Sequence, residues 1–253
     1  MLDFSRRLDT PSFARYALWR LGGRGSDTVD LKFRDGTRIR HCAADYGNAY
    51  EIFVSEVYKP VRQFAVSDVR LIVDLGANVG FSALYFLNKF KNARIIAFEP
   101  HPSHIERARA NWALNGATDK VRLYPAAASN KAGRLFLSDL GMSSTLHGAA
   151  PTSKKIEVDV MDVFEVLHGQ PIDILKIDIE GAEYDIIADD RFLNLDIKEI
   201  AMEWHRNETL GDEHAWLVDR LGRAGYEIED VFAQPHLGML WAFRKKNTFK
   251  VTG

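Results

Sequence analysis

Acidic side chains and one histidine follow two hydrophobic runs in the second half of the sequence. Asp178, Glu180 and Glu183 come after the first run, and Glu203 and His205 end the second. Residues two apart in an extended chain point to the same side, so Glu203 and His205 form a pair. Histidine is the usual general base at neutral pH, and a carboxylate can also remove a proton. We take Asp178, His205 and Glu180 as the candidate catalytic residues.

Two other interpretations of these acids remain open. Asp178 or Glu180 could cap a helix that begins near Gly181, where the helix dipole favours negative charge. This interpretation explains one acid well, whereas three acids so close together repel one another. Alternatively, Asp178, Glu180 and Glu203 could hold a divalent cation, since hard oxygen ligands suit Mg²⁺. The cation is the weaker hypothesis, and we expect no metal site.

A second chemical site is predicted where the run 71–75 passes into a glycine-rich turn. The dinucleotide-binding pattern requires glycines where this chain has Asn78 and Phe81, which argues against a pyrophosphate ligand. An acid followed by glycines at alternate positions, here Asp74, Gly76 and Gly80, is similar to the turn of class I methyltransferases. Their cofactor, S-adenosylmethionine, has an ammonium and a carboxylate that a turn carboxylate and backbone N–H groups can hold.

The next predicted strand supports a nucleoside-containing cofactor. It ends in Glu99, nineteen residues after Gly80, and a carboxylate there can accept hydrogen bonds from both hydroxyls of a ribose. Small residues at 126–128 could accommodate a flat adenine ring, or they could simply pack tightly. The candidate cofactor-binding residues are Asp74, Gly76, Ala77, Asn78, Gly80, Glu99, Pro100, Ala127 and Asp178.

The elements that position these residues follow an α/β pattern from residue 70 onward. Unbroken hydrophobic runs are typical of strands buried on both faces of a parallel sheet. The predicted strands are 71–75, 94–98, 121–124, 172–177 and 197–205, with an antiparallel pair at 226–231 and 239–243. Three helices are predicted in this part of the chain. One spans 81–87, one begins at a capping box formed by Ser103 and Glu106, and one spans 210–225. Segments 133–137 and 155–160 look like strands outside this sheet.

Residues 1–60 are predicted to form an extension, with the main domain at 61–253. The extension contains a helix at 11–21, a β-hairpin at 28–42 whose turn is Asp35-Gly36, and a helix at 46–57. It is rich in arginine, which allows a membrane-surface helix as an alternative. We favour a lid or a subunit contact, and hence a possible homodimer.

Composition limits the function classes. The chain has 253 residues and a formal net charge of −2, so there is no general electrostatic case for nucleic acid. The single cysteine, Cys42, gives no internal disulfide. No apolar stretch approaches the 18 residues of a membrane span, and the N-terminus lacks the features of a signal peptide. A cytoplasmic setting is the expected one.

The chain resembles the FkbM-type S-adenosylmethionine-dependent methyltransferases. The resemblance covers about residues 45–205 and rests on Asp74–Gly80, Ala97–Pro100, Ala127–Ser129 with Gly133, Ser143–Thr145 and, most diagnostically, Leu175–Glu183. It implies a seven-stranded class I methyltransferase sheet with helices on both faces, and O-methylation of a hydroxyl on a sugar, polyketide or similar small metabolite. Where the family often has Leu-Asp-Asp, this chain has Asp159-Val160-Met161-Asp162; the first acid and the spacing are altered, so no role is carried over there.

The expected chemistry is direct displacement of the sulfonium methyl by an acceptor oxygen, with His205 or Asp178 as the base. Two alternatives use the same sequence features: a nicotinamide-dependent oxidoreductase, and a non-catalytic scaffold that binds the cofactor. A nucleic-acid methyltransferase is disfavoured because no Asn/Asp-Pro-Pro-Tyr/Phe tetrapeptide follows Ile177. The Ser/Thr-rich segment 141–146 is a candidate substrate loop. The acceptor itself is not readable from the sequence.

Overall fold

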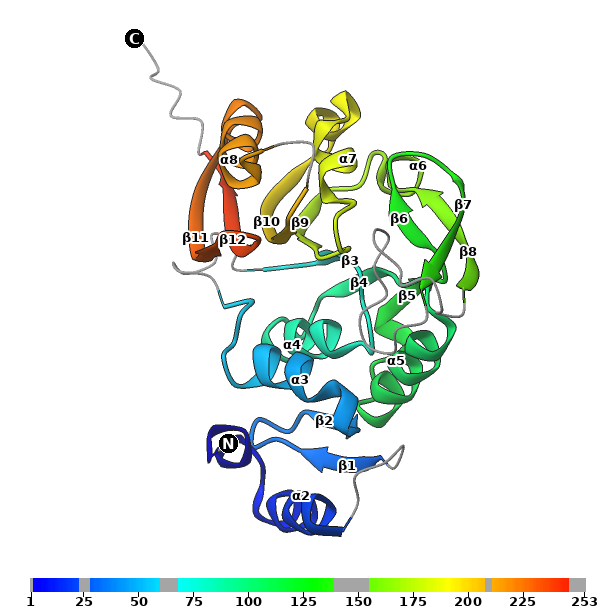
Figure 1. Ribbon diagram of the computed structural model, residues 1–253, viewed down its shortest axis with the longest axis vertical. Coiled ribbons are helices and arrows are strands. Elements are labelled where there is room, and N and C mark those ends of the chain that lie inside the picture. Colours follow the sequence, from blue (N-terminus) through cyan, green and yellow to red (C-terminus); the bar gives the residue numbers. More distant parts are fainter. Residues whose placement is uncertain (1, 23–27, 60–67, 139–154, 208–210, 246–253) are drawn as a thin grey trace.

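A seven-stranded, mostly parallel sheet forms the centre of the molecule (Figure 1). The computed structural model describes residues 2–22, 28–59, 68–138, 155–207 and 211–245, so the segment 141–146 lies outside the described residues. The strand order is β11-β12-β10-β9-β3-β4-β5. The bounds are β3 (Leu71–Leu75), β4 (Arg94–Phe98), β5 (Val121–Tyr124), β9 (Ile172–Ile177), β10 (Ile197–His205), β11 (Tyr226–Gln234) and β12 (Leu237–Arg244). The expected parallel sheet and the antiparallel addition at its end are confirmed.

The order of the strands explains where a ligand can bind. From β3 the chain builds outward to β4 and β5, and it later returns to the other side of β3 to form β9 and β10. The direction of building therefore reverses between β3 and β9. In open α/β sheets, ligands bind at such a switch point, outside the carboxyl ends of the strands. The turn after Leu75 and the acids after Ile177 both lie at this point.

Helices cover both faces of the sheet, as expected. One hydrophobic cluster joins the sheet to α3 (Tyr46–Phe53), α4 (Phe81–Lys89) and α5 (Pro102–Leu114). The other joins it to α6 (Val163–Leu167), α7 (Glu183–Ala188) and α8 (Glu213–Arg223). The predicted capping box at the start of α5 is wrong. His101 is the N-cap and Pro102 opens the helix, so Ser103 already lies in the first turn.

A separate three-stranded sheet stands beside the main one (Figure 1). It consists of β6 (Ala127–Ser129), β8 (Lys155–Asp162) and β7 (Gly133–Ser138), in that order. The sequence predicted β7 and β8 but not β6, because a short run of alanines and a serine has little β propensity. β6 forms because its backbone pairs in parallel with the end of β8.

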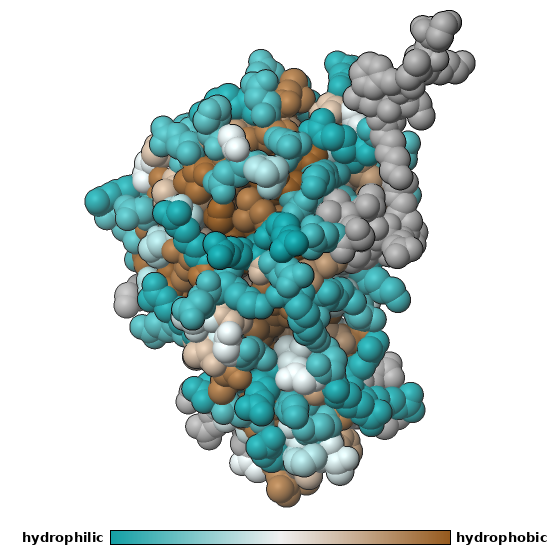
Figure 2. Space-filling view, turned by 180° about the vertical axis from the view of Figure 1, so that it is seen from behind, coloured by the Kyte–Doolittle hydropathy of each residue, from teal (hydrophilic) through white to brown (hydrophobic). Residues whose placement is uncertain are grey.

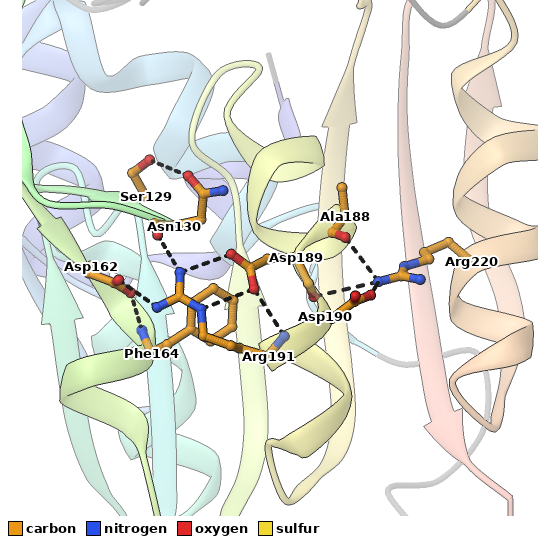
Figure 3. Close-up of polar contacts among 9 residues, drawn as sticks. All are labelled: Ser129, Asn130, Asp162, Phe164, Ala188, Asp189, Asp190, Arg191 and Arg220. Atoms are coloured by element: carbon orange, nitrogen blue, oxygen red, sulfur yellow. Dashed lines mark hydrogen bonds and ion pairs between the residues drawn. The ribbon is translucent and has the colours of Figure 1, made fainter.

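Arg191 fastens this small sheet to the main domain (Figure 3). It belongs to the 3-10 helix η3 (Asp190–Asn194), and its guanidinium donates to Asp162 Oδ2 at 2.7 Å and to the Asn130 carbonyl at 2.5 Å. Asp162 ends β8 and also caps α6 by accepting from the Phe164 N–H at 2.9 Å. Asp162, in the stretch that departs from the family's Leu-Asp-Asp run, therefore has a structural role here.

The N-terminal residues form a layer over the face that α4 and α5 cover. The layer contains α1 (Leu2–Arg7), α2 (Thr10–Gly22), β1 (Val29–Lys32), β2 (Arg38–His41), η1 (Ala43–Asp45) and α3; a further 3-10 turn, η2 (Thr118–Lys120), lies ahead of β5. Asn111 and Asn115 of α5 accept hydrogen bonds from two backbone N–H groups of β2. Apolar side chains of this layer share a cluster with the main domain. None of the described helices has the length and apolar character needed to cross a membrane.

Candidate active site

The turn between β3 and α4 approaches the end of β9 so closely that only glycine fits. Gly76 has a φ of +86°, and a methyl group there would overlap the backbone carbonyl oxygen of Asp178. Gly80 has a φ of +81°, and a methyl group there would overlap the indole of Trp112. Gly80 is therefore needed for helix packing, and its position is not on the cavity wall described below.

Asn78 and Glu99 connect the turn to the end of β4. Asn78 adopts a left-handed conformation with a φ of +49°, which asparagine tolerates better than most residues. Its backbone N–H donates to Glu99 Oε2 at 2.8 Å, and the His101 N–H donates to Glu99 Oε1 at 2.9 Å. His104 Nδ1 also lies 3.3 Å from Oε1, so three groups fix the orientation of a carboxylate that is only 5% exposed. Oε2 keeps lone-pair capacity for a further donor.

A cavity opens between this carboxylate and the end of β9. Its walls contain six of the nine predicted cofactor residues: Gly76, Asn78, Glu99, Pro100, Ala127 and Asp178. The structure adds Phe98, His104, Ala128, Leu137, Ile179 and Glu180. Phe98 stacks on Tyr124 with ring centroids 5.0 Å apart, which gives the cavity a rigid apolar side. Phe98, Ala128, Leu137 and Ile179 give this cavity an apolar lining in addition to a fixed carboxylate, a combination that suits an adenosine.

Asp74 is not one of the residues that line this cavity. Asp74 and Lys176 are register partners on the neighbouring strands β3 and β9, and both side chains are buried. Lys176 Nζ lies 3.1 Å from Asp74 Oδ1 and 3.4 Å from Asp178 Oδ2, and it donates to the Gly76 carbonyl at 2.5 Å. Burial alone would lower the pKa of Lys176, but the two carboxylates outweigh burial and raise it. Lys176 therefore keeps its positive charge and stabilises the turn through its hydrogen bond to the Gly76 carbonyl.

The predicted acids and His205 meet at the ends of β9 and β10. His205 Nδ1 lies 2.7 Å from Glu183 Oε1, while Nε2 lies 3.7 Å from Glu180 Oε2 and 3.8 Å from Glu203 Oε1. Glu183 has no exposed surface. The helix-cap interpretation of Asp178 and Glu180 is wrong, because Ala182 is the N-cap of α7 and no side chain caps it. Instead, Glu180 adopts a left-handed conformation, with a φ of +57°.

The proximity of these groups shifts their pKa values. Burial, followed by the charge of Asp178, raises the pKa of Glu203 to about 8. Burial also raises the pKa of Glu180. For His205, burial lowers the pKa, but the hydrogen bond and charge of Glu183 and the charges of Asp178 and Glu180 outweigh it and raise the value to about 9. Pockets of perturbed titratable groups are typical of functional sites.

A second cavity adjoins the first and shares Gly76, Asn78, Asp178 and Glu180 with it. One wall comes from the N-terminal layer, with Asn48, Glu51 and Ile52 of α3 and with Val57 and Tyr58 after it. Across the cavity lie Ala77, Ser82, Lys176 and Glu203. The Tyr58 hydroxyl lies 3.4 Å from Asp178 Oδ2. Sequence reasoning missed this wall, because nothing in residues 48–58 indicates which part of the fold they cover.

The residues of the weaker cation hypothesis do not all come together in the structure. Asp178, Glu203 and His205 can place ligand atoms within 4.8 Å of one another, and Glu180 is not part of this group. Lys176 already supplies a positive charge 3.4 Å from Asp178. We therefore assign no metal to these residues.

Comparison with known proteins agrees with this geometry. The profile of the methyltransferase FkbM domain matches residues 74–228. Methyltransferase sdnD of Sordaria araneosa is 31% identical over an alignment of 154 residues, and the match covers 46% of this chain and 58% of sdnD. The 2-O-methyltransferase NoeI of Sinorhizobium fredii is 30% identical over an alignment of 139 residues, and the match covers 47% of this chain and 56% of NoeI. The chain thus spans little more than half the length of these two relatives.

The fold has solved counterparts. The crystal structure of TYW2 from M. jannaschii, in complex with S-adenosylmethionine, aligns with a TM-score of 0.50 at 14% sequence identity, covering 87% of this chain and 86% of that one. This likeness confirms the expected class I methyltransferase fold. The matched segment 74–228 contains the turn, Glu99 and the whole acid–histidine group, and it makes up more than half of the sequence. The chain belongs to the methyltransferase FkbM domain family.

Proposed function

We propose that this protein is an S-adenosylmethionine-dependent O-methyltransferase whose acceptor is a hydroxyl group on a sugar, polyketide or similar small metabolite. The observation that carries the proposal is the junction of the two cavities at Gly76, Asn78, Asp178 and Glu180. A ligand in the first cavity reaches the second at this junction, near Glu203, whose Oε1 lies 3.8 Å from His205 Nε2. The family membership and the 2-O-methylation named for NoeI support the same reaction class.

The residues of the first cavity fit the cofactor. Glu99 is held by two backbone donors and His104, and its Oε2 is available to a ribose hydroxyl; the small side chains of Ala127 and Ala128 leave room for an adenine ring. Asp178 is available to the ammonium of the methionine part. Asp74 and Gly80 act through the turn they stabilise and make no contact of their own with the cavity.

The cofactor supplies an already activated methyl group, so the protein mainly has to align the acceptor oxygen. Orientation alone can contribute roughly 7–11 kcal/mol to lowering the barrier. Glu203, Glu51 and Asn48 line the second cavity and offer hydrogen-bonding groups to the acceptor. His205, through Nε2, or Asp178 removes the hydroxyl proton, which adds on the order of 10²–10⁴-fold. Because the pKa of His205 is raised to about 9, the fraction of His205 that is neutral and can act as a base increases as the pH rises toward 9.

The two other functions are less well supported. A nicotinamide cofactor needs glycine close to its pyrophosphate, but Asn78 uses its backbone N–H on Glu99 and Phe81 is buried in the core. A non-catalytic scaffold would not need a Glu183–His205 pair whose Nε2 faces Glu203 of the second cavity.

Thermal unfolding with S-adenosylmethionine, S-adenosylhomocysteine and NAD⁺ in parallel tests the cofactor. A ligand at a hundred times its dissociation constant adds about 2.7 kcal/mol, which raises Tm by roughly 5–10 °C for a domain of this size. We expect both adenosyl compounds, and not NAD⁺, to raise Tm. A rise with NAD⁺ alone would overturn the proposal.

The base is tested by turnover in the presence of hydroxylated acceptors, with the formation of S-adenosylhomocysteine as the readout. We expect the double variant Asp178→Ala with His205→Ala to lose at least 10²-fold in kcat. Unchanged turnover with intact cofactor binding would contradict the base assignment. Adding EDTA should leave the activity unchanged, since no metal is assigned.

A further inference from the structure

Helix α2 has two apolar faces, and only one of them is covered. Ser12 and Tyr16 are buried on the inner face, and the Ser12 hydroxyl accepts the Lys32 N–H of β1 at 2.8 Å. On the outer face, Phe13 is 48% exposed, Leu18 69% and Leu21 87%. At about 100° per residue, these three side chains with Ala14 and Ala17 occupy about 140° of the helix circumference, opposite the inner face. We call these five residues the outer stripe.

The charges on α2 are all positive and lie beside the outer stripe. Helical spacing puts Arg15 on one border of the stripe and Arg20 on the other. In the structure the Arg15 guanidinium donates to the Ser12 hydroxyl at 2.9 Å and the Arg20 guanidinium to the Tyr16 hydroxyl at 3.4 Å. The segment Thr10–Gly22 contains no acidic residue. Residues 1–45 hold nine lysines and arginines against six acids, a surplus of three positive charges in a chain whose net charge is −2. The positive surplus is therefore concentrated at this end of the molecule.

The outer stripe is accessible and lies apart from the candidate active site. Figure 1 places α2 at the lower tip of the molecule, and Figure 2 shows apolar atoms exposed at that tip. No residue of α2 lines either cavity of the site. A lid function for this helix therefore has no geometrical support. The outer stripe must be covered by something other than the ligand of the active site.

We propose that the outer stripe of α2 lies in the interface of an anionic lipid membrane, with Arg15 and Arg20 at the headgroups. An apolar stripe bordered by basic side chains is the pattern of helices that lie in the plane of a bilayer surface. A second copy of the chain fits less well. A two-fold contact would bring the same arginines of both copies together without an acid on α2 to pair with them. A stable dimer also needs about 800 Å² per partner, whereas three large and two small side chains offer roughly half of that area.

Co-sedimentation with vesicles tests the proposal. The full chain is mixed with vesicles of phosphatidylcholine and phosphatidylglycerol, or of phosphatidylcholine alone, at low and high salt. We expect binding to the anionic vesicles only, and weaker binding at high salt. Leu18→Ser with Leu21→Ser should weaken binding at least tenfold. Arg15→Gln with Arg20→Gln should weaken it by about 25-fold, since each arginine near an anionic surface contributes about a factor of five.

The control is Leu193→Ser with Val231→Ser, which removes two apolar side chains that are 46% and 36% exposed on other elements. This control should bind as the unchanged chain does. Because all the substituted leucines are exposed, Tm should stay within a few degrees in every variant. Absence of sedimentation with anionic vesicles, or equal binding to neutral ones, would overturn the proposal. So would a dimer in sedimentation equilibrium that the Leu18→Ser, Leu21→Ser pair dissociates, because that result assigns the stripe to a second copy.

Discussion

Glu183 and His205 form a directed pair next to Glu180 and Glu203, two acids that line the second cavity. Glu183 Oε1 lies 2.7 Å from His205 Nδ1, and Glu183 itself has no exposed surface. A carboxylate only accepts hydrogen bonds, so Nδ1 carries the hydrogen and Nε2 is left facing Glu180 and Glu203. The pair comes from two elements, the first residue of α7 and the last residue of β10. Glu183 therefore positions the nitrogen that we assign as base.

Replacing Glu183 by glutamine should lower the pKa of His205. Glutamine keeps an acceptor oxygen but removes the negative charge, and an opposite charge at this distance typically raises a histidine pKa by about 1–3 pH units. We expect the pKa of about 9 to fall by that amount, as followed by NMR of the imidazole Cε1–H. If His205 is the base, the alkaline rise in kcat should move to lower pH by the same amount.

The matched control for this prediction is Asp230→Asn. Asp230 lies 2.9 Å from His214 in a more exposed pair on α8 and β11. Its substitution should leave the titration of His205 unchanged. A purely structural role of Glu183 would reduce stability without moving the pKa of His205, and that result would contradict the positioning role.

Gly76→Ala should abolish cofactor binding, whereas Gly116→Ala should not affect it. Both glycines have positive φ values, +86° and +60°, so both substitutions incur about 1–2 kcal/mol of backbone strain. Only at Gly76 would the new methyl group overlap the Asp178 carbonyl, because Gly116 has open space around it. The overlap would force the turn away from β9 and separate Asn78 from Asp178. Calorimetric titration with S-adenosylhomocysteine measures the difference, and equal affinities in both variants would show that the contact is dispensable.

The sequence predicted most of the fold because its signals are local. The unbroken apolar runs of β3 and β9 identify buried parallel strands, and carboxyl ends of parallel strands meet at one edge of a sheet. It followed that the Gly76 turn and Asp178 would lie together. The antiparallel pair β11–β12 was also readable from its short connection.

The parts that the sequence could not give depend on contacts between distant segments. Asp74 was predicted to bind the cofactor, yet it faces Lys176, its register partner on a strand about a hundred residues later. Two opposite charges inside apolar strands do hint at such a pair, but the register is needed to match them. The wall formed by α3 and the contribution of Leu137 depend on packing alone.

Lys176→Met should destabilise the protein strongly. The substitution leaves Asp74 buried without its cation, and breaking a buried ion pair in this way costs about 3–5 kcal/mol. Asp74 also accepts a hydrogen bond from the Ser82 hydroxyl at 2.6 Å, so adding Asp74→Asn should recover part of the loss. Urea unfolding measures both. The control Arg223→Met removes a cation that is 76% exposed and paired with Asp219, itself 58% exposed, and it should cost about 1 kcal/mol or less. Equal losses in Lys176→Met and Arg223→Met would contradict the structural role of the buried pair.

His41 should make the protein less stable in mild acid. Its side chain is fully buried beside Phe4, Tyr16 and Trp19, and neither ring nitrogen has a hydrogen-bond partner among the residues that the structure describes. Burial lowers its pKa to about 4. Below pH 6.5, His41 therefore binds a proton in the unfolded chain but not in the folded chain. The free energy of unfolding falls as the pH decreases from 6.5 to about 4.

The substitution His41→Phe isolates this effect. It removes the titration and the unpartnered nitrogens while keeping a flat ring of similar size, so stability at pH 7.5 should be unchanged or higher. At pH 5 the unchanged chain should have lost about 2 kcal/mol relative to the variant, because one pKa unit corresponds to about 1.4 kcal/mol. His205 acts in the opposite direction: its raised pKa stabilises the fold below pH 6.5, and this contribution is lost as the pH rises toward 9. It is present in both proteins and cancels in the comparison. Parallel urea curves at pH 7.5 and 5 measure the difference, and an identical pH dependence of the two proteins would show that His41 is already protonated in the folded chain.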